Sequence, residues 1–295
     1  MSKKRRPRRR IRPELKYAGF VLLAGIGTAM GLYWFTQDHY AYEPIEDVAM
    51  PAMDPRTYHD YDLSLLRTDD NVYSYHDENY DSMFGIDVSS HNKDIDWKAA
   101  KASGVEFAMI RMGYRGYTEG GLATDEYFEK NITEASKQGI KVGVYFFSQA
   151  VNAEEAAQEA AYVIDAIQGY QIDMPVVYDM EFYPEETNAR ANMLTKEERT
   201  HNAVVFLENI KNAGYTPMMY ASTGTYDQLF LPGQLTQYPL WIAEYDNVCE
   251  YPYTFQIWQY SENGNAKQIP SGVDLNIAFI PKDPALQGQS ADKQH

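Results

Sequence analysis

Between residues 83 and 280 the chain alternates short apolar runs with longer amphipathic stretches. The apolar runs are rich in β-branched and aromatic residues, which is typical of buried strands. There are eight of them: FGIDVS (84–89), FAMIRMG (107–113), KVGVYFFS (141–148), MPVVYDME (174–181), PMMYAS (217–222), PLWIAEY (239–245), TFQIWQYS (254–261) and VDLNIAFI (273–280). Helical spacing predicts three helices, over 124–138, 153–168 and 195–213. Thr195 and Glu198 form a capping box by sequence, and Gly139 and Gly214 are placed to end helices.

Strands that alternate with helices predict a parallel sheet, and eight strands predict closure into a barrel. The last three strands are separated only by residues 246–253 and 262–272, which are too short for ordinary helical crossovers. We therefore predict an α/β fold: an irregular (β/α) TIM-like barrel with eight strands over residues 83–280, the last strands lacking helical crossovers and partly antiparallel.

An uncharged segment near the N-terminus, residues 17–35, lies between Lys16 and Asp38. Its 19 residues would span roughly 28 Å as a helix, close to the hydrocarbon thickness of a bilayer. Tyr17 and Trp34 stand near its two ends, where aromatic rings favour the membrane interface. The segment predicts a single transmembrane helix; a cleaved signal peptide is the alternative.

The first sixteen residues contain nine Lys or Arg and one acid, Glu14. The positive-inside rule leaves residues 1–16 in the cytoplasm and sends the rest of the chain across the inner membrane to the outside. Gly27 and Gly31 form a GxxxG pattern that favours weak self-association of the transmembrane helix. We thus expect a single-pass protein whose large C-terminal domain is extracytoplasmic.

The charge of the remaining chain limits its partners. The basic segment contributes +8 to a formal net charge of −16, so the other residues carry −24. Such an acidic chain excludes nucleic-acid binding as a main role. Residues 36–82 are acidic and without periodicity, which predicts a linker or stalk, and residues 281–295 are read as a C-terminal tail.

The Cys and His content restricts the chemistry. The single cysteine, Cys249, excludes an intrachain disulfide, and no histidine motif accompanies it to suggest a nucleophile. The six His show no metal-binding spacing. We expect no metal site and no cofactor.

Four carboxylates occupy strand positions where burial is costly: Asp87, Asp179, Glu181 and Asp274. In α/β barrels, residues at the carboxyl ends of strands line the active site. Asp179 and Glu181 are two residues apart, so on a strand they share a face with Cα atoms roughly 6–7 Å apart. At this spacing one carboxyl can stay protonated beside an ionised neighbour, as acid-catalysed glycoside hydrolysis requires. An Asp-x-Glu at a strand end is by itself a weak signal.

Aromatic residues near the same strand ends strengthen this interpretation. Rings that can stack on sugar faces are Tyr145, Tyr220, Trp241, Tyr245 and Trp258. The chain has 25 Tyr, and packing is an equally good explanation for this surplus. Arg111 lies among apolar neighbours, and it is expected to pair with Asp87 or Asp179 or to contact the substrate.

The segments FGIDVSSHNKDIDW, FAMIRMGY, GVYFFS, VVYDME, LWIAEY, FQIWQYS and GVDLN occur in an order that resembles glycoside hydrolase family 25, the lysozymes or N-acetylmuramidases. The resemblance implies a barrel of mixed strand direction in a bacterial envelope protein. It also implies cleavage of the β-1,4 bond between N-acetylmuramic acid and N-acetylglucosamine in peptidoglycan strands. By motif, Glu181 resembles the proton donor and Asp179 its carboxylate partner, while Asp87 and Asp274 resemble flanking acids that orient the substrate.

The mechanism and two other functions stay open at this point. A carboxylate nucleophile, attack by the substrate's own 2-acetamido group and inversion through water use similar residues; we favour the substrate-assisted route. A non-catalytic peptidoglycan-binding envelope protein and another acid/base glycosidase, such as a chitinase, are the alternative functions.

Overall fold

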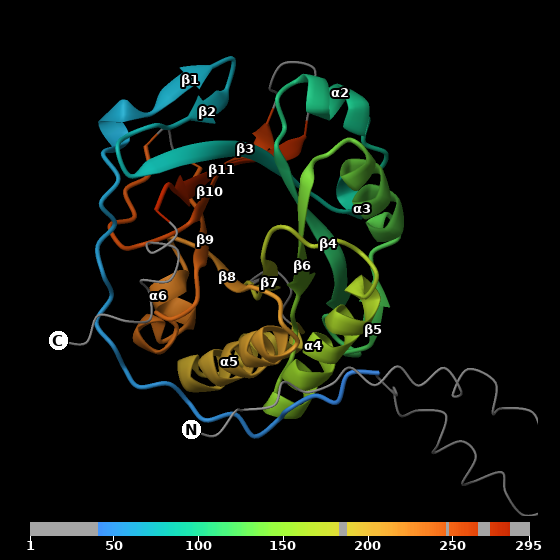
Figure 1. Ribbon diagram of the computed structural model, residues 1–295. Helices are drawn as coiled ribbons and strands as arrows, with labels where there is room; N and C mark the ends of the chain where they lie inside the picture. The colour runs from blue at the N-terminus through green and yellow to red at the C-terminus, as the bar shows by residue number, and fades with distance from the viewer. Residues whose placement is uncertain (1–40, 183–187, 246–247, 265–271, 284–295) are drawn as a thin grey trace, which may run out of the picture. The chain divides into compact units, whose positions relative to one another are not determined.

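Eight strands close into a barrel in the computed structural model, which describes residues 41–182, 188–245, 248–264 and 272–283 (Figure 1). The strands are β3 (Tyr80–Val88), β4 (Phe107–Arg115), β6 (Lys141–Phe147), β7 (Val176–Asp179), β8 (Pro217–Ser222), β9 (Leu240–Ala243), β10 (Ile257–Gly264) and β11 (Val273–Pro281). They pair in the order β3-β11-β10-β9-β8-β7-β6-β4, and pairing of β3 with β4 closes the circle. The predicted irregular eight-stranded barrel is confirmed.

Strand direction changes at one strand only. β11 is antiparallel to both of its neighbours, β10 and β3, whereas the other neighbouring barrel strands are parallel. β9 and β10 are parallel although no long helix is described between them. The short late connections therefore produce antiparallel pairing at β11 alone.

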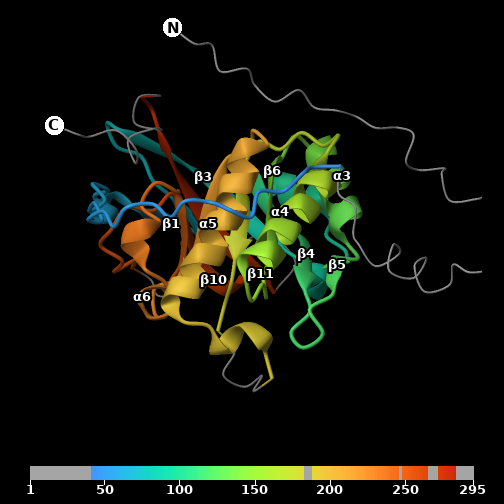
Figure 2. The same cartoon turned by 90° about the horizontal axis from the view of Figure 1, so that it is seen from below.

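Helices cover the outside of the barrel (Figures 1 and 2). They are α2 (Trp97–Ala102), α3 (Phe128–Lys137), α4 (Ala153–Ile167), α5 (Lys196–Asn212) and the short α6 (Tyr226–Leu229). Single 3-10 turns occur at η2 (Leu63–Leu65), η3 (Ser90–Asn92), η4 (Arg190–Met193) and η5 (Pro232–Gln234). Helices α4 and α5 match the predicted ranges to within one residue at each end.

Local signals explain where these helices begin and end. The Thr195 side chain accepts a hydrogen bond from the Glu198 amide, and the Glu198 side chain accepts one from the Thr195 amide, so the predicted capping box is formed. Gly139 and Gly214 have φ of +68° and +92°, which glycine adopts without strain just past a helix end. The predicted start of the first of the three helices, at residue 124, is wrong, because β5 (Leu122–Thr124) pairs with β4 and α3 begins only at Phe128.

The barrel interior changes from apolar to polar along its axis. Its apolar layer consists of Met83, Phe107, Met109, Val177, Met218, Tyr220, Trp241, Ala243, Ile257 and Ala278. On several strands the next inward position, two residues further toward the carboxyl end, is polar: Asp87 after Gly85, Asp179 after Val177 and Gln259 after Ile257. Because β11 runs the opposite way, its first inward residue, Asp274, reaches the same end.

Residues 44–62, here called the strap, lie along the outside of this unit (Figure 2). Asn209 of α5 hydrogen-bonds both backbone groups of Ile45, with the Ile45 amide 2.7 Å from Oδ1 and the Ile45 carbonyl 2.8 Å from Nδ2. Val48 packs against buried residues of α4 and α5. Residues from Pro44 onward therefore belong to the same compact unit as the barrel.

Tyrosines cover the side of the barrel at β10 and β11. Tyr61, in the strap, stacks on Phe279 with ring centroids 4.1 Å apart. Tyr73 stacks on Tyr260 at 4.2 Å; it belongs to β2 (Val72–Ser74), which pairs with β1 (Arg67–Asp69). Part of the tyrosine surplus thus serves packing where helices are short or missing among the described residues.

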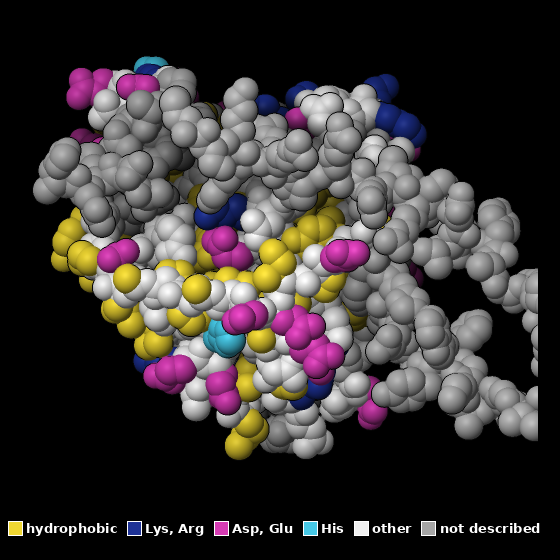
Figure 3. Space-filling view, turned by 60° about the horizontal axis from the view of Figure 1, so that its bottom comes forward, with side chains coloured by type: hydrophobic (Ala, Val, Ile, Leu, Met, Phe, Trp, Pro, Cys, Tyr) yellow, Lys and Arg dark blue, Asp and Glu magenta, His cyan; other side chains and the backbone are white. Residues whose placement is uncertain are grey.

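The described exterior is acidic on at least one face. Figure 3 views the side on which α4 and α5 lie, where carboxylates are spread among hydrophobic side chains and Lys and Arg are few. Such a surface repels polyanions.

Within the described ranges, no helix combines the length and apolar character needed to cross a membrane. The segment 17–35, where a transmembrane helix is predicted, lies outside those ranges, as do residues 1–16 and 284–295.

Candidate active site

A cavity of about 330 Å³ opens where the parallel strands end and β11 begins. Its lining consists of Asp87, Tyr145, Asp179, Glu181, Tyr220, Trp241, Tyr245, Gln259, Glu262 and Asp274. The four carboxylates singled out in the sequence are therefore brought together, with four of the five proposed aromatic residues. Arg111 and Trp258 are not among the lining residues.

Asp179 and Glu181 lie on the same side of the chain at the end of β7. Met180 between them is buried and does not line the cavity, as the alternation of a strand predicts, and Glu181 comes two positions after Asp179, the last strand residue. Asp179 is only 5% exposed, and its Oδ1 has no hydrogen-bond partner among the described residues. Burial raises the pKa of Asp179 well above its usual range, the charge of Glu181 raises it further, and Arg111 opposes this. This direction of the shift favours the protonated form of Asp179 beside Glu181.

Asp87 and Asp274 form a second pair, directly opposite each other on β3 and β11. Oδ2 of Asp87 accepts hydrogen bonds from Asn276 Nδ2 at 2.7 Å and from Gln259 Nε2 at 2.8 Å. Burial raises the pKa of both groups, and for Asp274 the charge and hydrogen bond of Asp87 add to the increase. The proton of this pair therefore resides on Asp274, and Asp87 is the ionised member.

Gln259 connects this pair to the aromatic rim. Its Nε2 donates to Asp87 and, at 3.3 Å, to Oδ2 of Asp274. Its Oε1 accepts from the hydroxyls of Tyr220 and Tyr245, each at 3.0 Å. Since the amide must donate to a carboxylate, its oxygen must face the tyrosines, so the network fixes the orientation of the side chain.

The aromatic residues divide into a floor and a rim. Trp241 is 2% exposed, donates from Nε1 to Asn276 Oδ1 at 2.8 Å, and meets the Tyr220 ring edge-on with centroids 4.8 Å apart. Tyr145 contacts the same indole with centroids 6.0 Å apart. Tyr245 is 47% exposed and stands at the mouth. Of these rings, Tyr245 offers the largest exposed surface to a sugar.

Arg111 and Trp258 do not line the cavity, for different reasons. The expected pairing of Arg111 with Asp87 or Asp179 is wrong: its Nε binds Asp125 Oδ2 at 2.8 Å, although its charge still acts on Asp179. Trp258 points to the other face of β10, donates from Nε1 to the Glu244 carbonyl at 2.8 Å and is completely buried. A ring in that place has no exposed face for sugar stacking.

Three residues in or beside the cavity were not among the predicted site residues: Asn276 and Gln259 of the hydrogen-bond network and the lining residue Glu262. Asn276 follows Asp274 by two positions, so strand alternation alone places them on one face. Gln259 likewise follows Ile257 of the barrel interior by two positions, so it lies on the same face of β10. Glu262 is exposed on β10, and no sequence signal distinguishes it. Among the described residues, no group of three or more His, Cys, Asp or Glu side chains is arranged to hold a metal ion.

A family model for glycosyl hydrolases family 25 matches residues 86–269, which is more than half of the chain. The chain belongs to glycosyl hydrolases family 25. The matched range contains Asp87, Asp179 and Glu181, and Asp274 lies just beyond it. Family membership makes the protein a glycoside hydrolase of the lysozyme type.

Relatives of this family 25 hydrolase are distant in sequence. The "Uncharacterized protein YegX" of Escherichia coli O157:H7 is 28% identical, over 66% of this chain and 69% of that protein. The "Autolytic lysozyme" of Clostridium acetobutylicum is 27% identical, over 66% of this chain and 55% of that protein. A solved family 25 glycosyl hydrolase from Bacillus anthracis is 26% identical with a TM-score of 0.55, over 72% of this chain and 94% of that chain.

Proposed function

We propose that this family 25 hydrolase is a muramidase, which cleaves the β-1,4 bond between N-acetylmuramic acid and N-acetylglucosamine in peptidoglycan. The observation that carries the proposal is the pair Asp179 and Glu181 in one cavity with the pair Asp87 and Asp274. Binding alone requires no proton-sharing pair. The lysozyme of Clostridium acetobutylicum among its relatives supports the same substrate.

The unpartnered oxygen of Asp179 supports substrate assistance. Burial disfavours the ionised form of Asp179, so in this proposal Asp179 carries a proton before the substrate binds. The N–H of a bound 2-acetamido group can donate to Oδ1, the buried atom that lacks a partner among the described residues. This hydrogen bond stabilises ionised Asp179 and leaves the proton on Glu181. Substrate binding therefore favours the protonated form of Glu181 that acts as the general acid.

The reaction then follows in two steps. Glu181 gives its proton to the leaving glycosidic oxygen as the bond from C1 to that oxygen breaks, and the acetamido oxygen bonds to C1. The resulting oxazolinium ion carries a positive charge beside the Asp179 carboxylate. Water next attacks C1, returns a proton to Glu181 and releases the acetamido group. The product retains the anomeric configuration, and an inverted product seen by NMR contradicts this route.

The proposed function is tested with full-length protein in mild detergent on purified peptidoglycan. Mass spectrometry of released fragments is expected to show reducing N-acetylmuramic acid ends. Glu181→Gln keeps the size of the side chain but removes the acid, and it is expected to lower the rate by about 10²–10⁴-fold. Glu134→Gln, at an exposed ion pair on α3, is the matched control with full activity expected.

Two results would contradict the proposed function. Retention of peptidoglycan without released fragments indicates a binding protein. Faster cleavage of chitin than of peptidoglycan in parallel assays indicates a chitinase-type glycosidase. Full activity of Glu181→Gln rejects the assignment of the proton donor while leaving the substrate assignment intact.

We also propose that residues 17–35 anchor the protein in the inner membrane, with the catalytic domain outside. The support is the uncharged sequence and the basic residues before it. The protein is expected to resist carbonate extraction, and a protease added to spheroplasts is expected to reach the barrel. Leu22→Arg with Leu23→Arg adds about 5–7 kcal/mol to the cost of insertion and is expected to abolish anchoring. Unchanged extraction of that variant rejects the anchor.

Weak self-association through Gly27 and Gly31 is part of the same proposal. Crosslinking in membranes is expected to fall when both are replaced by Leu.

A further inference from the structure

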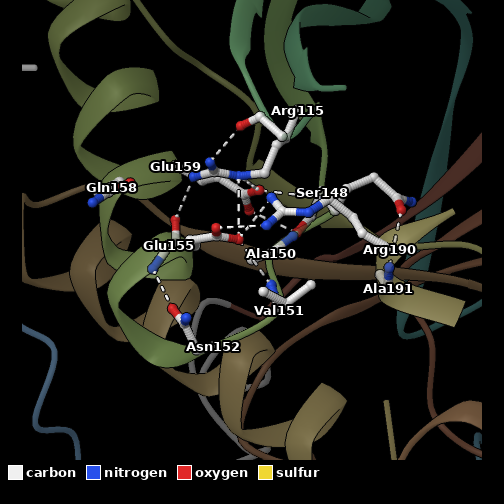
Figure 4. A network of polar contacts seen from close by, with 12 residues as sticks. Arg115, Ser148, Ala150, Val151, Asn152, Glu155, Gln158, Glu159, Arg190 and Ala191 are labelled. Atoms are coloured by element: carbon white, nitrogen blue, oxygen red, sulfur yellow. Dashed lines mark hydrogen bonds and ion pairs between the residues drawn. The ribbon is translucent and has the colours of Figure 1, made fainter. Parts of the chain in front are cut away.

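Two arginines, which are not used in the proposed reaction, belong to a network of polar contacts with helix α4 (Figure 4). Arg115 is the last residue of β4, and Arg190 is the first residue of η4, on the connection that follows Glu181. Their partners are Glu155 and Glu159, one helical turn apart on α4. Each arginine has its own carboxyl partner, with Arg115 on Glu159 and Arg190 on Glu155.

The inner half of this cluster supports the strand ends. Arg115 Nε binds Glu159 Oε1 at 2.7 Å, and neither side chain is more than 5% exposed. The second oxygen of Glu159 accepts from Ser148 Oγ at 2.6 Å, and the Ser148 amide donates to the Asp179 carbonyl at 2.7 Å. Ser148 thus connects the Arg115–Glu159 pair to the backbone of β7, the strand that carries Asp179.

The outer half joins two loops. Arg190 binds Glu155 through both of its terminal nitrogens, Nη1 to Oε2 at 3.0 Å and Nη2 to Oε1 at 2.8 Å. The Arg190 amide donates to the Tyr117 carbonyl at 2.9 Å, across to the turn between β4 and β5. Arg115 Nη1 donates to the Gly120 carbonyl of that same turn at 2.7 Å.

The fit between Arg190 and the turn depends on a glycine. Gly120 has φ of +70°, and a Cβ added there would lie 2.0 Å from Arg190 Nη1. The guanidinium therefore packs directly on the turn backbone. Figure 2 shows the turn and the η4 segment projecting side by side from the same end of the barrel. Met193, at the end of η4, is 89% exposed.

We propose that Arg190 and Glu155 are positioning residues for the polymeric substrate. Their bidentate ion pair holds the β4–β5 turn (residues 116–121) and the η4 segment (residues 188–194) together as one wall beyond the catalytic carboxylates. A cavity of about 330 Å³ encloses only a small part of a glycan strand. Both segments follow the carboxyl ends of barrel strands, β4 and β7, and the cavity opens at this end, so the proposal places the continuing strand along them. The inference rests on the proposed muramidase function and assigns a further part of that site.

The split between kcat and KM tests this role. Full-length wild type and Arg190→Ala are compared on long glycan strands and on the shortest oligosaccharide that the wild type cleaves. Loss of a bidentate charge-assisted contact is expected to raise KM for long strands by about tenfold. Effects on kcat and on the short substrate are expected to stay within about twofold. Arg190→Lys keeps the charge but not the fork, and it is expected to fall between the two.

Hydrogen exchange tests the wall itself. Arg190→Ala is expected to lose protection in peptides that contain residues 116–121 and 188–194, and elsewhere to match the wild type. Lys130 of α3 forms a surface ion pair with Asp94, and Lys130→Ala, which breaks it, is the matched control. Neither the rise in KM nor the loss of protection is expected for this variant.

Each outcome decides the matter. An equal loss of kcat/KM on long and short substrates means a merely structural role and overturns the proposal. An unchanged KM for long strands in a variant whose loops exchange faster overturns it as well. Unchanged exchange shows that the pair does not hold the wall. If the wild type cleaves no peptidoglycan at all, the proposed function fails first, and exchange still reports whether the two loops are joined.

Discussion

Glu159 makes the stability of the fold depend on pH in a way that can be calculated. Its side chain is completely buried, and burial raises its pKa from 4.5 to about 7 in spite of Arg115 and Ser148. The native state therefore binds a proton between pH 4.5 and about 7 that the unfolded chain has released. The contribution of Glu159 to the free energy of unfolding is fully present below pH 4.5 and is lost as the pH rises through about 7.

The expected size follows from the shift. A difference of about 2.5 pKa units corresponds to about 3 kcal/mol of unfolding free energy. Glu159→Gln keeps the shape of the side chain and removes its titration. The unfolding free energy of the wild type is thus expected to fall by about 3 kcal/mol more than that of the variant between pH 4.5 and pH 8. Other buried carboxyls titrate in both proteins and cancel in the difference.

Urea unfolding followed by tryptophan fluorescence at half-unit pH steps measures both curves. Glu134→Gln, at an exposed ion pair, is expected to follow the wild type within about 0.5 kcal/mol. Parallel curves for the wild type and Glu159→Gln would falsify the reasoning. They would mean that Arg115 keeps Glu159 ionised throughout and that burial does not control its proton.

Three further predictions concern single side chains. Gln259→Leu removes four hydrogen bonds and leaves the buried Tyr220 hydroxyl without its acceptor, so urea unfolding is expected to show a loss of about 2–4 kcal/mol, and activity assays a lower kcat. Tyr61→Ala removes the ring stacked on Phe279 and a hydrogen bond to the Phe255 carbonyl; thermal unfolding is expected to show a loss of about 2–4 kcal/mol with KM unchanged, and a change in KM contradicts a purely packing role. Thr195→Ala breaks the capping box of α5 and is expected to cost about 1 kcal/mol in urea unfolding; no loss means that the cap is dispensable.

Strand alternation made most of the barrel and the four carboxylates predictable from the sequence. A period of two assigns each strand residue to one side, so Asp179 and Glu181 had to share a face. The same rule, applied to β10, separates Trp258 from Ile257 and Gln259. The residue type of Trp258 suggests sugar stacking, whereas its position in the alternation correctly places it on the buried outer face of β10.

Other contacts could not be read from the sequence because they depend on loops. Asp125 was placed in the first turn of a predicted helix, whereas it lies in a turn after β5 and takes Arg111 as its partner. The contacts of Arg190 with Glu155 join residues 35 positions apart through a connection without periodicity. Residues 44–62 likewise lack a repeating pattern, so nothing in their order reveals that Tyr61 stacks on Phe279.

The strap also determines how mechanical force enters the enzyme. A load applied to the chain before Pro44 meets the two hydrogen bonds between Ile45 and Asn209 first. It next meets the packing of Val48, the hydrogen bond from the Asp54 amide to the Gly233 carbonyl and the ion pair of Arg56 with Asp227. The stacked ring of Tyr61 follows, and the first residues of β3 come later. Pulling therefore peels the strap from the surface one contact at a time, while Asp87, at the far end of β3, is shielded from the strain.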